Sequence, residues 1–169
     1  MLRSAGELTI NQTTQFAGYY GSFYSSSDQA DGVTPTLMYC ENTADADGVS
    51  MELNLVNKKS RMTFAHTGTY NIQFSAQLHN TGGGGSGQTV NIWFRLNDNN
   101  IADSDTKMVV PSNAPYAVAA WNFIVSVAAG DYVEIVWLTD NSNIILEHEI
   151  ATVNVPAIPS VIMTAQQIR

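Results

Sequence analysis

The chain has 169 residues, of which 13% are charged and 44% hydrophobic, and its formal net charge is −8. This length suits one ordinary domain with a single core. Because the negative charge removes any electrostatic attraction to phosphate backbones or anionic lipid, we expect no nucleic-acid partner and no membrane partner. The only cysteine, Cys40, cannot form an intrachain disulfide, so the domain has to be stable without one.

The first part of the chain divides into an arm, a strand and a loop. Residues 1–15 are polar and rich in Thr and Gln, and we expect them to form a docking arm ahead of a single domain over residues 16–169. An aromatic-dense stretch over 16–24 predicts the first strand, and residues 25–32 have the composition of a loop. From Val49 to Leu55, apolar and polar residues alternate, which predicts a half-buried strand.

The clearest alternation runs from Tyr70 to Leu78, where every second residue is apolar and those between are polar. A glycine-rich stretch over 82–87 follows, and then a second alternating stretch from Val90 to Leu96. We expect these two strands to pair as a hairpin. Trp93 is the exception on the polar face of the second strand.

Two further strands are predicted around a turn composed of residues 128–131. The stretch 121–127 alternates, and the stretch from Tyr132 to Leu138 is apolar on both faces except at Glu134, so both of its faces should be covered. These strands are expected to form a second hairpin. A last strand should follow the prolines at 156 and 159, and no segment has a helical period. Short antiparallel strands with one solvent-exposed face have to bury the other face against a second sheet. The sequence therefore predicts an all-β antiparallel sandwich, a jelly roll of eight to ten strands.

Two short motifs imitate ligand-binding loops. The stretch 82–89 has the glycine spacing and final Thr of a phosphate-binding loop, but Gln88 stands where the lysine is needed and a strand follows where a helix should. The stretch 45–48 resembles the middle of a calcium loop, yet Thr43 and Asn54 occupy its first and last ligand positions. We expect a solvated turn there, and the remaining alternative is a surface calcium held by a looser set of oxygens.

No candidate catalytic, cofactor-binding or metal-binding residues emerge from the sequence. The three histidines are far apart and lack metal-ligand spacing, and Cys40 follows an apolar stretch as a small buried residue would. Most aromatic residues are expected in the core. Trp93 and Tyr132 lie opposite the apolar faces of their strands, and with Val136 and Leu138 they are our candidates for contacts with a subunit or partner.

Two passages resemble a known family, the trimeric jelly roll of complement-type globular heads and tumour necrosis factor-like domains. Residues 64–74 (FAHTGTYNIQF) are similar to that family's turn glycine, tyrosine and alternating strand, and residues 127–135 (VAAGDYVEI) are similar to its Gly-Asp-x-Val turn. The ending over 156–164 lacks the Ser, Phe and Gly signature of animal members. Together with 90–97 and 120–137 it looks more like the versions carried by tailed bacteriophage virion proteins.

The resemblance implies a homotrimer built around the sheet that carries both chain termini. On this basis we expect a non-enzymatic virion structural protein, a homotrimeric capsid decoration (cement) protein that stabilises a phage head and contacts the major capsid protein or another virion protein. Assembly in the host cytoplasm fits the missing disulfide and the lack of a secretion signal in the first residues. The alternatives are a fibre knob and a receptor- or carbohydrate-binding module.

Overall fold

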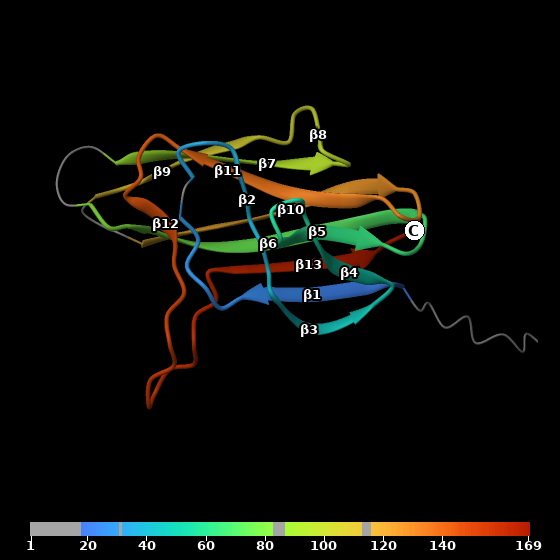
Figure 1. Ribbon diagram of the computed structural model, residues 1–169, viewed down its shortest axis with the longest axis horizontal. Coiled ribbons are helices and arrows are strands. Elements are labelled where there is room, and N and C mark those ends of the chain that lie inside the picture. The colour runs from blue at the N-terminus through green and yellow to red at the C-terminus, as the bar shows by residue number, and fades with distance from the viewer. Residues whose placement is uncertain (1–17, 31, 83–86, 113–115) are drawn as a thin grey trace, which may run out of the picture.

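The computed structural model describes residues 18–30, 32–82, 87–112 and 116–169 (Figure 1). The expected docking arm at 1–15 and the first residues of the expected strand at 16–24 lie outside this part. The described residues contain no helix that is long and apolar enough to cross a membrane. They form thirteen strands, of which ten have five or more residues, in agreement with the eight to ten predicted. The strands are β1 (Tyr20–Ser25), β2 (Thr36–Leu37), β3 (Asn42–Asp47), β4 (Val49–Leu53), β5 (Lys59–Phe64), β6 (Gly68–Asn80), β7 (Gln88–Leu96), β8 (Asn99–Asn100), β9 (Thr106–Val110), β10 (Tyr116–Val127), β11 (Tyr132–Thr139), β12 (Ile144–Leu146) and β13 (Val161–Gln167).

The strands form two antiparallel sheets that pack as a sandwich. One has the order β10-β6-β13-β1-β3, with β12 beside β6, and we call it the terminal sheet because it holds the first and the last strand. The other has the order β4-β5-β11-β7-β8, with β2 beside β11 and β9 beside β7, and we call it the opposite sheet. β1 and β13 lie side by side in the lower part of Figure 1, with β7 and β11 in the upper part. The predicted all-β antiparallel jelly roll is confirmed.

The core lies between the two sheets, and the strand alternation explains it. In β6 the inward residues from Tyr70 to Leu78 are at most 4% exposed, as their period predicts. Aromatic rings then meet across the sandwich: Phe64 and Tyr70 have ring centroids 4.5 Å apart. Phe94 stacks on Phe123 at 4.9 Å. Contacts of this kind fix the two sheets relative to each other beyond what area burial alone contributes.

Both predicted hairpins are wrong. β6 pairs with β10, β12 and β13, whereas β7 pairs with β8, β9 and β11 in the opposite sheet. β10 and β11 likewise belong to different sheets, although the predicted turn between them exists, with Gly130 at φ 89°. Each connection therefore crosses from one sheet to the other. A turn sequence specifies a change of chain direction, and it does not specify whether the next strand pairs with the previous one.

Two smaller predictions, both at the edges of the sheets, differ from the structure. The strand predicted from Val49 to Leu55 ends at Leu53, which is 51% exposed, and Leu55 is 94% exposed in the turn to β5. The expected solvated turn at 45–48 is instead the end of the exposed edge strand β3, followed by Gly48 at φ 71°. The late strand is confirmed as β13, and Cys40 is fully buried, as expected of a small apolar residue.

Candidate functional site

The outward face of the terminal sheet carries no charge on four neighbouring strands. β1, β6, β10 and β13 contain no Asp, Glu, Lys or Arg. Along these strands the outward side chains alternate with the buried core residues and are small, amide, hydroxyl or apolar. We call this surface the uncharged face, and its members are Tyr20, Ser22, Tyr24, Thr69, Asn71, Gln73, Ser75, Gln77, Val118, Ala120, Asn122, Ile124, Ile162, Thr164 and Gln166.

Exposed apolar side chains are mixed into this face. Val118 and Ile124 on β10 are 57% and 56% exposed, and Ile162 on β13 is 39% exposed. Between β1, β6 and β13 the surface forms a hollow of about 340 Å³ whose lining includes Gln73 and Thr164. A broad sheet face with apolar side chains, hydrogen-bonding groups and no net charge has the composition of the centre of a protein–protein interface, where charged residues are depleted.

The edges of the uncharged face hold the nearest ionisable groups. On one side the hydroxyl of Tyr20 donates to Asp45 on β3 at 3.2 Å, and the negative charge of Asp45 raises the pKa of Tyr20. On the other side the ring of His79 stacks on Tyr116 at 4.4 Å, and its Nδ1 lies 2.9 Å from a carboxylate oxygen of Glu147. This placement is the usual arrangement of an interface with an apolar or neutral centre and a polar rim.

The opposite sheet differs in this respect, since most of its strands carry charge. Its charged side chains are Glu52, Lys59, Arg61, Arg95, Lys107 and Glu134. The two faces of the sandwich are therefore chemically distinct, and only one of them is suited to burial without desolvating charges.

The four predicted contact residues all lie on the opposite sheet, Trp93 on β7 and the other three on β11. As the sequence predicts, both faces of β11 are covered, and Val133 to Trp137 are buried. The cover is provided by the chain itself: Val136 is 0% exposed, with Leu37 and Trp93 as its cross-strand neighbours. The sheet that the family resemblance places at the centre of a trimer is the terminal sheet, so the four residues lie on the other side of the molecule. Their contact role stays a prediction.

Tyr132 and Glu134 belong to a cluster around Arg61 on that same face. The guanidinium of Arg61 lies 4.4 Å from the ring centroid of Tyr132, and its Nε donates to Glu134 at 3.3 Å. The hydroxyl of Tyr132 donates to Asp98 at 2.7 Å. Glu134 is 1% exposed, and burial raises the pKa of its carboxyl group, although Arg61 partly opposes the shift. Arg61 thus holds the buried carboxylate of Glu134, the exposed carboxylate of Asp98 and the ring of Tyr132 together, and we interpret the cluster as a structural contact.

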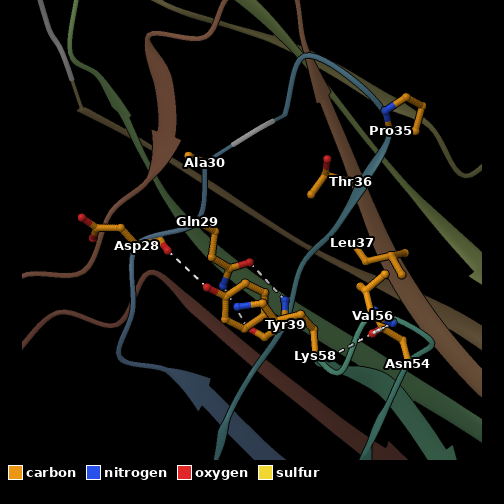
Figure 2. A pocket seen from close by; sticks show the side chains of 10 residues that line it. All are labelled: Asp28, Gln29, Ala30, Pro35, Thr36, Leu37, Tyr39, Asn54, Val56 and Lys58. Carbon is orange, nitrogen blue, oxygen red and sulfur yellow. Dashed lines mark hydrogen bonds between the residues drawn. The ribbon is translucent and has the colours of Figure 1, made fainter.

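A further hollow lies between the loop after β1 and the turn from β4 to β5 (Figure 2). Its volume is about 570 Å³. The buried side chain of Gln29 accepts from the backbone N–H of Tyr39 at 3.1 Å and donates to the Tyr39 carbonyl at 2.8 Å, which fixes the floor. Lys58 Nζ lies 4.4 Å from the Tyr39 ring centroid and covers that ring. The polar groups of this groove are mostly engaged with one another.

The described part of the chain contains neither a metal-binding cluster nor an accessible cysteine. Within it, no three His, Cys, Asp or Glu side chains lie close enough together to hold a metal ion. Cys40 is buried, and burial raises the pKa of its thiol, which keeps the group protonated and unreactive at neutral pH. The sequence does contain a signal for the uncharged face, because four separate stretches lack charged residues. That signal could not be used before the structure showed that the four strands are neighbours in one sheet.

Comparisons with known proteins bear on the fold. No protein-family model matches the chain, and no curated protein matches it. Among solved structures, the structure of Eiger TNF from S. frugiperda matches with a TM-score of 0.58 and 8% identity, over 90% of this chain and 93% of that one. A match of this extent at such low identity shows that the chain has a tumour necrosis factor-like jelly-roll fold. It leaves the function to be argued from the surfaces.

Proposed function

We propose that the protein is a non-enzymatic structural protein that assembles as a homotrimer through the uncharged face of the terminal sheet. The observation that carries the proposal is the complete lack of Asp, Glu, Lys and Arg in β1, β6, β10 and β13. The chain as a whole has 22 such residues among 169, so four adjacent strands without any of them form a distinct surface. Amide and hydroxyl groups can recover their cost of desolvation by hydrogen-bonding across an interface, whereas each unpaired charge buried in an interface is strongly unfavourable.

The geometry of this face supports a large contact between copies. Four long neighbouring strands present amide and hydroxyl groups that can pair across an interface, together with exposed Val118, Ile124 and Ile162 for apolar burial. Interfaces that hold permanent oligomers bury more area and are more apolar than transient ones. A trimer formed in this way would leave the opposite sheet facing outward.

For the biological role, we infer a capsid decoration (cement) protein of a tailed bacteriophage, with the major capsid protein as partner. The inference rests on the resemblance of residues 90–97, 120–137 and 156–164 to phage virion versions of this jelly roll. In this account a trimer seats on the shell, and its binding to the assembled form stabilises that form by mass action. The arm at 1–15, which lies outside the described residues, is the proposed docking segment. A fibre knob is the alternative.

The experiment compares the full-length protein with a variant lacking residues 1–15. The molar mass of each is measured by light scattering, and each is then mixed with purified phage shells and sedimented. We expect both proteins to be trimers and only the full-length protein to sediment with shells. If the truncated protein sediments equally well, the arm is not the docking segment. If neither protein binds any shell tested while both remain trimers, the decoration role is wrong and the assembly proposal stands.

A further inference from the structure

A second groove lies on the outward face of the opposite sheet, around Trp93. It has a volume of about 400 Å³, within the range of small-molecule sites. Trp93, Ile101 and Leu138 supply its apolar surface. Its other lining residues are two amides and two carboxylates, Asn91, Asn100, Asp103 and Asp105. Two of the predicted contact residues therefore meet in one groove, on the side of the molecule away from the uncharged face.

The indole ring is held in a fixed orientation. Trp93 Nε1 donates to Asn100 Oδ1 at 2.8 Å, and the same oxygen accepts from Arg95 Nε at 2.9 Å. Trp93 itself is partly exposed, so its ring remains part of the groove surface. A ring that is already oriented loses little conformational freedom when a ligand stacks on it.

The loop that carries the two carboxylates is also fixed. Ser104 is 5% exposed, and its hydroxyl accepts from the backbone N–H of Phe94 at 3.1 Å and donates to the Ile101 carbonyl at 2.8 Å. On either side of this buried anchor, Asp103 and Asp105 project from the loop at the groove. Asp105 accepts from Asn91 Nδ2 at 2.7 Å, which orients both groups. Within the described part of the chain, Asp103 makes no hydrogen bond through its side chain.

From this arrangement we propose that the groove binds a neutral saccharide. The C–H face of a pyranose ring would stack on Trp93, as apolar ligand surfaces do on aromatic rings. Sugar hydroxyls both donate and accept hydrogen bonds, which matches a rim of amides that can do both and carboxylates that accept. The two carboxylates would repel acidic sugars and phosphorylated ligands. A simple cation would use only the carboxylates and the ring, and would leave the two amides without a role.

In the proposed trimer the groove would face outward. A trimer built on the terminal sheet would carry three such grooves on its outer surface, and three weak sites on one particle bind a surface glycan far more tightly than one site. The saccharide site does not itself depend on the trimer. A monomeric variant should retain it, so a failure of either proposal can be told apart from a failure of the other.

The test is a titration of the isotope-labelled protein with glucose, galactose, mannose and N-acetylglucosamine, followed by NMR. The signals followed are the indole N–H of Trp93 and the backbone N–H groups of Asn91, Asn100 and Asp105 at the groove, which remain as reporters in variants that lack the indole. Trp93→Phe assigns the indole signal among those of the three tryptophans. For ligands of this size we expect a dissociation constant of about 1 mM for at least one sugar. Trp93→Ala should weaken binding about tenfold or more, and Asp103→Asn should weaken it severalfold with the fold unchanged. Tyr39→Ala, in the groove of Figure 2, is the matched control and should bind as the wild type does.

Three results would overturn the proposal. The first is that no sugar shifts the Trp93 signal at about 50 mM, a large excess over the expected constant. The second is that Trp93→Ala and Asp103→Asn both bind as tightly as the wild type. The third is that choline shifts the signal while all four sugars do not, which would make the groove a cation site.

Discussion

Removing the Arg61 side chain should destabilise the protein in a way that depends on pH. Arg61→Ala leaves the Glu134 carboxylate, which is 1% exposed, without its ion-pair partner, and Arg95 on the neighbouring strand is the cation that still favours its ionised form. Breaking a buried ion pair in this way costs about 3 to 5 kcal/mol. Because the Arg61 side chain is 21% exposed and water can reach part of the gap, we expect a loss near the lower limit, about 3 kcal/mol at pH 7. The contact of Arg61 with the exposed Asp98 adds little to this figure.

The pH dependence follows from the direction of the pKa shift. Burial raises the pKa of Glu134 in the folded protein above that of an exposed glutamate, about 4.3. The folded state therefore holds this proton more tightly than the unfolded state, and its stability falls as pH rises from the unfolded pKa through the folded one. Without Arg61 the folded pKa rises further, so the loss caused by Arg61→Ala should be clearly smaller at about pH 5 than at pH 7.

The assay is urea unfolding at both pH values and at one fixed protein concentration, since any association would add to the apparent stability. The double variant Arg61→Ala/Glu134→Ala serves as the control and should recover part of the loss, because it removes both charges. An equal loss at both pH values, or a double variant less stable than Arg61→Ala, would show that the unpaired charge of Glu134 is not the cause of the destabilisation.

Three further outcomes test individual contacts. Gln29→Ala should lower the free energy of unfolding by about 2 kcal/mol, because the part-buried N–H and C=O of Tyr39 lose their partner; an unchanged urea midpoint would contradict this. Gly48→Ala should cost about 1 to 2 kcal/mol, since Gly48 has φ 71° and an added Cβ would collide with the ring of Tyr19; a stabilised variant would show that the turn relaxes. Cys40 should react with a thiol-specific dye only after denaturant unfolds the chain, because its thiol is buried with a raised pKa; fast labelling of the native protein would count against that burial.

The strands could be predicted from the sequence, because a strand with one buried face alternates apolar and polar residues over a few neighbouring positions. The alternation from Tyr70 to Leu78 appears in the structure as the inward residues of β6. Val49 to Leu55 shows the limit of the same rule, because apolar residues in a turn continue the pattern beyond the end of the strand. Leu55 keeps the period and is nevertheless exposed.

Strand pairing was not readable in the same way, because partners are chosen by contacts distant along the chain. β6 pairs with β13 through residues such as Phe74 and Met163, almost ninety positions apart. The two expected hairpins failed for this reason, since a turn after one strand fits both a hairpin and a crossover to the other sheet. The same limit applies to the surfaces. The uncharged face becomes one surface only when β1, β6, β10 and β13 lie side by side, and the Trp93 groove depends on the loop at 101–105 returning to β7.

The most direct test of the assembly proposal is the molar mass in solution of the wild type and of Gln73→Lys, measured by light scattering. Gln73 is an exposed residue in the middle of the uncharged face, between Asn122 and Thr164 on the neighbouring strands. Thr106→Lys, at an exposed position on β9 of the opposite sheet, is the matched control for the added charge. Assembly through the uncharged face predicts three times the 18.3 kDa chain mass for the wild type and the control, and a folded monomer for Gln73→Lys. A monomeric wild type, or a Gln73→Lys protein that remains a trimer, would contradict it.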